Sequence, residues 1–247
     1  MKKDIERFQK KIDLYNNSIH KNGIGTLNEH SLHSIIKNYI EEDESKHEVK
    51  VCGYVADIFN DNGITEIQTR NFSVLNRKLE KYLDEHDVTI VYPCAHIKHI
   101  VWIDPETGEC VKRNRSPRVG DGCAFLYEAS RIRTYLGHPR LKFVVMLIDM
   151  DEHKLLNGRG PERKIFASRE ELRPLSLFDI IEIHKASDLK KILPPDFPGD
   201  SFKFSDFEKV MRMKGRTARF SMNALVEFGA VDIVGKDKNA FIYKLII

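Results

Sequence analysis

The pattern of apolar and polar positions in residues 51–70 predicts a β-hairpin. Apolar residues with strand character stand on both sides of residues 60–63, where the sequence reads Asn-Asp-Asn-Gly. Asn-Gly is a strong signal for a short hairpin, because both residues adopt the positive φ angles that a tight turn needs. Three polar residues interrupt the apolar strands of this hairpin: Asp57, Glu66 and Gln68.

Two registers of this hairpin are possible, and both gather the polar residues. A turn centred on residues 61–62 sets Asp57 opposite Glu66. A turn centred on residues 62–63 sets Asp57 opposite Gln68. Side chains alternate between the two faces of a strand, so in either register the three polar groups share one face. Two carboxylates and an amide oxygen suit Mg²⁺ or Mn²⁺, although a solvated polar sheet face gives the same pattern.

Helical periodicity occurs before and after the hairpin. An apolar stripe in residues 2–19 predicts an amphipathic helix that packs on the main domain or on a second copy of the chain. Residues 26–41 form a second predicted helix with a capping box at its start. In this helix Glu29 either caps the first turn or adds a carboxylate to the metal cluster. A third predicted helix, residues 73–83, carries Lys78 in its second turn.

Later apolar runs predict strands that join the hairpin in one sheet. Residues 88–92 form a short strand that ends at Pro93, and residues 99–103 form a separate strand. Residues 124–136 predict a helix, and residues 143–148 a central strand. Three acidic residues follow that strand and are interpreted as a turn at its end rather than as a second acidic cluster: Asp149, Asp151 and Glu152. The expected fold class is α/β, with a mixed central β-sheet flanked by helices.

Composition favours a cytoplasmic protein. The chain has 247 residues, of which 41% are hydrophobic and 31% charged, so it can bury a substantial core. No apolar run approaches the roughly 20 residues of a membrane span, and the first residues lack the apolar core of a signal peptide. We therefore expect no membrane partner. The four cysteines show no CxxC spacing, which favours reduced thiols over a zinc site.

Charge is unevenly distributed, although the formal net charge is only +3. Residues 111–142 contain eight basic and two acidic residues, and residues 201–247 contain nine basic and five acidic residues. Local basic stretches on a nearly neutral chain indicate nucleic-acid contacts, with a solvated rim as the alternative. Within the first stretch, residues 113–122 predict a loop whose arginines contact phosphates: Arg113, Arg115 and Arg118.

Residues 26–91 resemble the restriction-endonuclease-like PD-(D/E)XK nucleases, and the resemblance extends to about residue 150. The order is a helix with Glu29, a strand with Asp57, a strand with Glu66-Ile67-Gln68, and a helix. The resemblance implies that Asp57, Glu66 and the main-chain carbonyl of Ile67 bind one or two Mg²⁺ or Mn²⁺ ions. Glu29 would complete the site directly or through water.

One position departs from the common form of this motif. Gln68 stands where the family usually has Lys. Some members of the family carry the catalytic Lys on the following helix, and Lys78, or else Arg77 or Arg70, would take that role here. An exposed cation without a catalytic role is the alternative for each of them. Either Gln68 or Lys78 would then orient the attacking water.

The last 47 residues resemble a winged helix-turn-helix. Helices are expected from Ser205 to Met211 and from Thr217 to Phe228, followed by strands at residues 231–234 and 240–245 around a turn. In that family the second helix enters the DNA major groove and the wing contacts the backbone. The resemblance assigns DNA contacts to the second helix and the wing: Arg216, Arg219, Asn223, Lys236 and Lys238.

These features give an expected organisation and function. The domains are an N-terminal helix (1–25), a nuclease domain (26–193), a proline-rich linker (194–200) and a winged helix (201–247). The expected function is a metal-dependent endonuclease that hydrolyses phosphodiester bonds, with DNA as the partner and a homodimer as the plausible assembly. The alternatives are a catalytically inactive DNA-binding regulator, for which Gln68 is the visible sign, and a subunit of a defence or repair complex that acts only with a protein partner.

Overall fold

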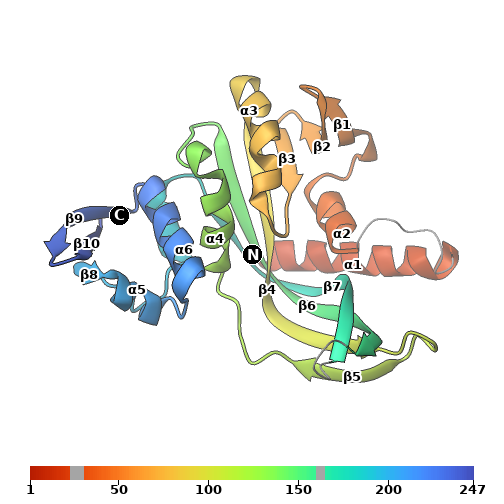
Figure 1. Ribbon diagram of the computed structural model, residues 1–247. Helices are drawn as coiled ribbons and strands as arrows, with labels where there is room; N and C mark the ends of the chain where they lie inside the picture. The colour runs from red at the N-terminus through yellow and green to blue at the C-terminus, as the bar shows by residue number, and fades with distance from the viewer. Residues whose placement is uncertain (23–30, 160–164) are drawn as a thin grey trace. The chain divides into compact units, whose positions relative to one another are not determined.

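The computed structural model describes residues 1–22, 31–159 and 165–247 of the chain (Figure 1). These residues form two compact units. Unit 1 comprises residues 1–47, 95–120 and 146–179, and unit 2 comprises residues 48–94, 121–145 and 180–247. The domain boundaries expected from the sequence stay a prediction.

The main sheet has seven strands and is mixed, which confirms the expected α/β class. Its order is β1-β2-β3-β4-β6-β7, and β5 pairs with β4. Strands β2 and β3 form an antiparallel hairpin, and β3 runs parallel to β4. A parallel pair needs a crossover connection, and helix α3 supplies it. The strands are β1 His47–Val51, β2 Tyr54–Asn60, β3 Gly63–Ile67, β4 Val88–Ile103, β5 Cys110–Arg115, β6 Leu141–Arg159 and β7 Ile165–Ile183.

Unit 1 contains the N-terminal helices α1 (Lys2–Asn22) and α2 (Ser31–Ile40), followed by the short 3₁₀ turn η1 (Glu44–Lys46). The stripe expected on the first helix is partly buried, because Phe8 packs edge to face on Tyr39 of α2 with the ring centroids 5.3 Å apart. This contact confirms that the stripe packs within the chain. The expected start of the second helix, residues 26–30, lies outside the described residues.

The expectation that Pro93 ends a strand is wrong. Strand β4 continues through Pro93 to Ile103, so the two predicted strands are one. Proline lacks a backbone N–H and therefore disrupts a strand only where a neighbour needs that donor. The pairing of β4 with β3 runs from Val88 to Val91, so Pro93 lies beyond it.

Two further expectations for unit 1 are wrong. The three acidic residues after the central strand lie inside β6, and Arg113 and Arg115 lie in β5 rather than in a loop. Polar side chains from neighbouring strands explain why an extended conformation accommodates so many charges. Asp149 accepts a 2.8 Å hydrogen bond from His96, Lys98 Nζ lies 2.6 Å from Glu152, and Arg113 pairs with Asp151 at 2.9 Å. The strand pattern is hidden because charge pairs replace the expected apolar residues.

Unit 2 contains the hairpin, the helices that follow it and the C-terminal elements. The 3₁₀ turn η2 (Phe72–Leu75) precedes α3 (Asn76–Glu85), so this helix begins later than expected. Helix α4 (Ala124–Ala129) changes to the 3₁₀ turn η3 (Ser130–Tyr135), with non-helical angles at Ile132, instead of forming one helix.

The C-terminal segment forms its own small sheet. The elements of this segment are η5 (Ala186–Lys191), β8 (Ser201–Lys203), α5 (Phe204–Val210), α6 (Gly215–Glu227), β9 (Val231–Asp237) and β10 (Ala240–Leu245). The strand order is β8-β10-β9 with antiparallel pairing. The two expected helices and the hairpin are therefore present, although α6 begins two residues before Thr217. The C-terminal end of α6 packs on α4, where Phe228 contacts Phe125 and Phe143 with centroids 6.3 and 5.7 Å away.

No helix within residues 1–22, 31–159 and 165–247 has the length and apolar character that crossing a bilayer requires.

Candidate functional site

The observed hairpin has the first of the two possible registers. Ile58 pairs with Thr65, Phe59 with Ile64 and Asn60 with Gly63, so the turn is centred on residues 61–62. Continuing this register by one position sets Asp57 opposite Glu66. The two carboxylates therefore project from the same face of the sheet, as the sequence predicted.

The Asp57 carboxylate takes part in the hydrogen bonding of the strand pair itself. Its Oδ2 accepts a 2.7 Å hydrogen bond from the backbone N–H of Ile67. A strand residue directs its N–H and its C=O to the same side, so the Ile67 carbonyl also faces β2. This geometry brings an acidic side chain and a main-chain carbonyl together at the same end of the hairpin.

Lys78 of helix α3 completes the cluster. Its Nζ lies 2.8 Å from each of the two Glu66 carboxylate oxygens and donates a further 2.7 Å hydrogen bond to the Val55 carbonyl. Apolar residues of α3 hold the helix in place, among them the fully buried Leu79. The structure thus places the Lys78 ammonium against Glu66. The catalytic role expected for Lys78 stays a prediction.

Burial changes the protonation of this cluster. Glu66 is only 3% exposed. Removal from water is the largest cause and the nearby Asp57 charge the second, and together they raise the pKa of Glu66 to about 7, although Lys78 partly opposes both effects. Burial, as the larger cause, and the Glu66 charge also raise the pKa of Tyr82. In the absence of a metal ion, Glu66 therefore exchanges a proton close to neutral pH.

Tyr82 is a member of the cluster that sequence analysis assigned only to the apolar face of its helix. It follows Lys78 by four residues, and residues four apart share a helix face. The four-residue spacing from Lys78 is the sequence feature that could have placed Tyr82 in the cluster. The Tyr82 side chain is buried and packs edge to face on Tyr54, with ring centroids 6.2 Å apart.

Gln68 lies at the edge of this arrangement. It follows the last residue of β3, its backbone N–H donates to the Val91 carbonyl at 2.9 Å, and its side-chain amide donates to the Arg70 carbonyl. The amide is therefore engaged with the following loop. Glu29 lies outside the described residues.

The donor set fits Mg²⁺ or Mn²⁺ by its chemistry. Asp57, Glu66 and the Ile67 carbonyl are hard oxygen ligands, which these ions prefer. Asp57 uses Oδ2 for the Ile67 N–H, and Oδ1 is its second carboxylate oxygen. A metal ion that binds Glu66 would compete with the Lys78 ammonium for the same two oxygens.

The expected nucleic-acid contacts of unit 2 lie on exposed surfaces. Arg216, Arg219 and Asn223 are exposed on α6, and the Arg216 guanidinium lies 5.3 Å from the ring centre of Phe220. Lys236 lies on β9 over the Phe241 ring, and Lys238 occupies the turn that follows β9. These side chains are therefore accessible on the second helix and on the hairpin.

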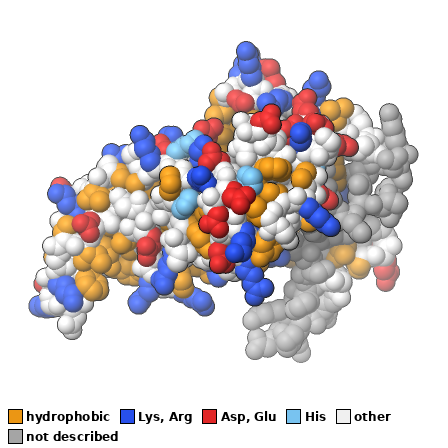
Figure 2. Space-filling model, turned by 90° about the horizontal axis from the view of Figure 1, so that it is seen from above, with side chains coloured by type: hydrophobic (Ala, Val, Ile, Leu, Met, Phe, Trp, Pro, Cys, Tyr) orange, Lys and Arg blue, Asp and Glu red, His pale blue; other side chains and the backbone are white. Residues whose placement is uncertain are grey.

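The basic residues of unit 1 differ in their surroundings. Arg113, Arg115 and Arg118 are all exposed, and the charge of Arg113 is compensated by Asp151. On the face shown in Figure 2, basic and acidic side chains are interspersed and do not form one continuous basic area. The first basic stretch is therefore less positive locally than its sequence indicates.

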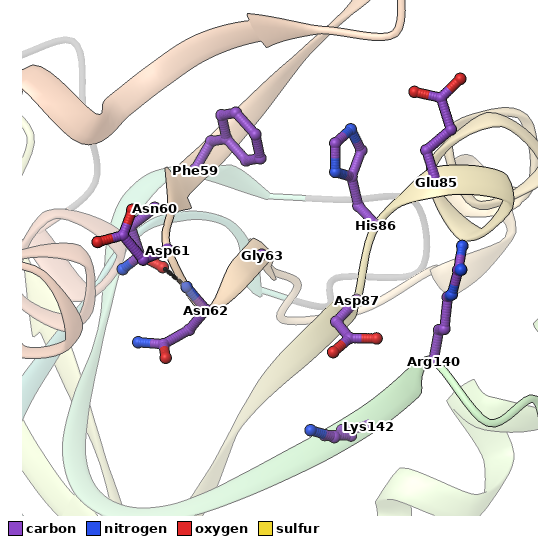
Figure 3. A pocket seen from close by; sticks show the side chains of 10 residues that line it. All are labelled: Phe59, Asn60, Asp61, Asn62, Gly63, Glu85, His86, Asp87, Arg140 and Lys142. Carbon is purple, nitrogen blue, oxygen red and sulfur yellow. Dashed lines mark hydrogen bonds between the residues drawn. The ribbon is translucent and has the colours of Figure 1, made fainter.

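A separate shallow pocket lies beside the hairpin turn in unit 2 (Figure 3). It has a volume of about 600 Å³, and Asp57, Glu66 and Lys78 do not line it. Arg140 stands at its edge and donates to the carbonyls of Leu83 and Asp84 at the end of α3. The pocket is lined by residues of the hairpin turn, the end of α3 with the two residues after it, and the start of β6 with the residue before it: Phe59, Asn60, Asp61, Asn62, Gly63, Glu85, His86, Asp87, Arg140 and Lys142.

Comparisons with known proteins give a family and one distant relative. A family model described as "Domain of unknown function (DUF8091)" matches residues 30–184. A protein of Treponema pallidum (strain Nichols), described as "Uncharacterized protein", is 30% identical over 141 residues. That alignment covers 57% of this chain and 56% of the relative, so the chain spans little more than half of the relative's length. No solved structure shows a significant match.

Proposed function

The chain belongs to the family described as Domain of unknown function (DUF8091), and we propose that it is a metal-dependent nuclease. One observation carries the proposal. Asp57, Glu66 and Lys78 come from two strands and a helix and converge at one end of the hairpin, where Lys78 contacts Glu66 directly. The order of a hairpin, a helix and a parallel strand around these residues supports the resemblance to the PD-(D/E)XK nucleases.

The residues of the cluster have distinct roles in this proposal. Mg²⁺ or Mn²⁺ held by Asp57, Glu66 and the Ile67 carbonyl would supply Lewis acidity, which activates water and stabilises the leaving oxygen of a phosphodiester. Lys78 would donate a hydrogen bond to the attacking water or to a phosphate oxygen. The Val55 carbonyl holds the Lys78 ammonium in position. Glu66 must lose its proton to bind the metal ion, so activity should increase as pH rises through about 7.

DNA is the proposed substrate and partner, bound through the C-terminal segment. The β8-β10-β9 sheet order and the two helices before the hairpin support a winged-helix interpretation. The exposed side of α6, with Arg216, Arg219 and Asn223, would face the major groove, and Lys238 would contact the backbone from the wing. Contacts with phosphates make such binding strongly dependent on salt.

The decisive experiment is a cleavage assay with matched variants. The full chain is incubated with supercoiled plasmid, linear duplex, branched DNA and RNA in Mg²⁺, Mn²⁺ or EDTA. Asp57→Asn, Glu66→Gln and Lys78→Met should each lower the rate at least about 100-fold. Asp61→Asn lies in the turn of the same hairpin and serves as the control, with an expected rate within about twofold of the wild type. Cleavage that persists in Asp57→Asn would refute the proposed site.

A second candidate function is a nuclease-like regulator that binds DNA without cutting it. The observation that favours it is the engagement of Gln68 with the Arg70 carbonyl, away from the acidic pair. This candidate predicts duplex binding that is unchanged by EDTA and by Asp57→Asn, with no cleavage of any substrate. A third outcome, cleavage only after addition of a cell extract, would indicate a subunit that needs a protein partner.

A further inference from the structure

Three potential metal ligands of different chemistry, none of them Asp57 or Glu66, meet at one place in unit 2. Cys52 lies in the turn between β1 and β2, and Glu85 and His86 lie at the C-terminal end of α3. The Cys52 Sγ, a Glu85 carboxylate oxygen and a His86 ring nitrogen all lie within 4.8 Å of one another. Residues far apart in the sequence thus come together in one place, so no CxxC-type spacing reveals the cluster.

The backbone on the Cys52 side is tightly constrained. Cys52 has a φ angle of 49° and Gly53 a φ angle of 81°. Consecutive positive φ angles define a two-residue turn of the type in which Asn, Asp and Gly are preferred. Cysteine is an unusual residue at this position. The turn fixes the backbone position from which the thiol projects, and Cys52 is only partly buried, so that it is accessible to an ion from solvent.

The α3 side is held equally well. The His86 backbone N–H donates to the Tyr82 carbonyl at 2.8 Å, where the helix ends, and its ring packs edge to face on Phe59 at 5.2 Å. Figure 3 shows the Glu85 and His86 side chains extending to the same side of the chain, while Asp87 extends to the other. Two ligands from adjacent residues are therefore presented together to the Cys52 turn.

We propose that Cys52, Glu85 and His86 form a Zn²⁺ site. Thiolate sulfur, imidazole nitrogen and carboxylate oxygen are the three ligand types that Zn²⁺ binds in proteins, whereas Mg²⁺ prefers oxygen alone. Three protein ligands leave a fourth tetrahedral position for water. The site is therefore distinct in metal preference from the Asp57 and Glu66 cluster, and its existence does not depend on nuclease activity.

The position of this site gives it a structural consequence. A bound ion would tie the β1–β2 turn to the end of α3, the helix that carries Lys78 and Tyr82. It would stabilise the placement of α3 against the hairpin without contacting Glu66. The zinc site would therefore raise the melting temperature of the chain, because a ligand that binds the folded state alone shifts the unfolding equilibrium.

The test uses the untagged, reduced full chain and the metal ions alone. Co²⁺ is titrated as a spectroscopic probe, because Co²⁺–thiolate bonds give a charge-transfer absorption, and Zn²⁺ affinity follows from competition. Cys52→Ser and His86→Gln should each raise the dissociation constant at least about tenfold, and Cys52→Ser should abolish the thiolate band. Cys110→Ser is the matched control, since Cys110 is exposed and lies in unit 1.

A second measurement needs no variant and so remains informative if a variant folds poorly. The wild-type chain is alkylated with iodoacetamide, with and without equimolar Zn²⁺, and each cysteine is quantified by mass spectrometry. Zn²⁺ should slow alkylation of Cys52 several-fold and leave Cys110 unchanged, because a metal-bound thiolate is a poor nucleophile. Equal alkylation of Cys52 with and without Zn²⁺, or a thiolate band that survives in Cys52→Ser, would overturn the proposal.

Discussion

Replacing Glu66 by Gln tests whether this buried carboxyl group titrates near neutral pH. In the folded chain burial raises its pKa to about 7, from an ordinary value of 4.5 that applies to the unfolded chain. Between these two pH values the folded state binds more protons than the unfolded state. The stability contributed by the neutral carboxyl is therefore fully present below pH 4.5 and is lost as pH rises to about 7. A glutamine side chain cannot ionise, so the Glu66→Gln variant lacks this loss.

The size of the effect follows from the two pKa values. Each pH unit between them corresponds to about 1.4 kcal/mol, so the wild type should lose about 3 kcal/mol relative to Glu66→Gln between about pH 4.5 and about pH 8. Glu66 is almost completely buried, so solvent screening reduces this figure little. The difference between the two proteins removes the contributions of other titrating groups, which are common to both.

The assay is urea denaturation at several pH values from about 4.5 to about 8, in EDTA, with fluorescence and circular dichroism as probes. Glu80→Gln, an exposed substitution on the same helix, is the control and should follow the wild type at every pH. Addition of Mg²⁺ should restore stability to the wild type above about pH 7 but not to Glu66→Gln. A stability difference that stays constant across this pH range would show that Glu66 has an ordinary pKa and would refute this reasoning.

Three further predictions concern single residues. Lys78→Met leaves the Glu66 carboxylate without a counter-ion, so it should destabilise the chain by roughly 3 kcal/mol at about pH 8. The loss should be smaller at about pH 5, where Glu66 is protonated, and urea denaturation at the two pH values measures the difference. Gly63→Ala should lower the free energy of unfolding by about 3 kcal/mol, because φ is 98° and a Cβ would lie 2.3 Å from the Asp87 carbonyl oxygen. Gly229→Ala, with φ of 73° and open space around the Cβ, should lower it by about 1 kcal/mol. Urea denaturation measures both changes. Arg219→Ala should weaken duplex binding and reduce the slope of log affinity against log salt by about 1, and an unchanged slope in fluorescence anisotropy would exclude a phosphate contact.

The hairpin and its acidic pair could be predicted because local rules determine them. Asn-Gly chemistry locates the turn, and strand alternation puts Asp57 and Glu66 on one face in either register. The contact of Lys78 with Glu66 was only one of several possibilities, since helix periodicity gives the face of Lys78 but not the distance from α3 to β3. Tyr82 was missed because an aromatic residue on an apolar helix face is usually core.

Long-range pairing explains what the sequence did not reveal. Pro93 looks like a strand end until the extent of the β3–β4 pairing is known. Asp149 and Glu152 look like a turn until their partners on β4, His96 and Lys98, are identified. The Cys52 cluster was also missed, because only the folded chain brings the β1–β2 turn to the end of α3.

The packing of α6 on α4 has a consequence for where a cut would fall. Phe228 at the end of α6 contacts Phe125 of α4 and Phe143 of β6, and Phe220 of α6 contacts Tyr127 of α4, all within the unit that also holds Asp57 and Glu66. These ring contacts hold α6 against α4 and β6. In the proposed nuclease, this helix would set the distance between the bound DNA sequence and the cleavage point. Sequencing the ends of the products should then show cleavage at one fixed number of base pairs from the bound sequence. A DNA-binding domain on a flexible linker would instead give a spread of distances.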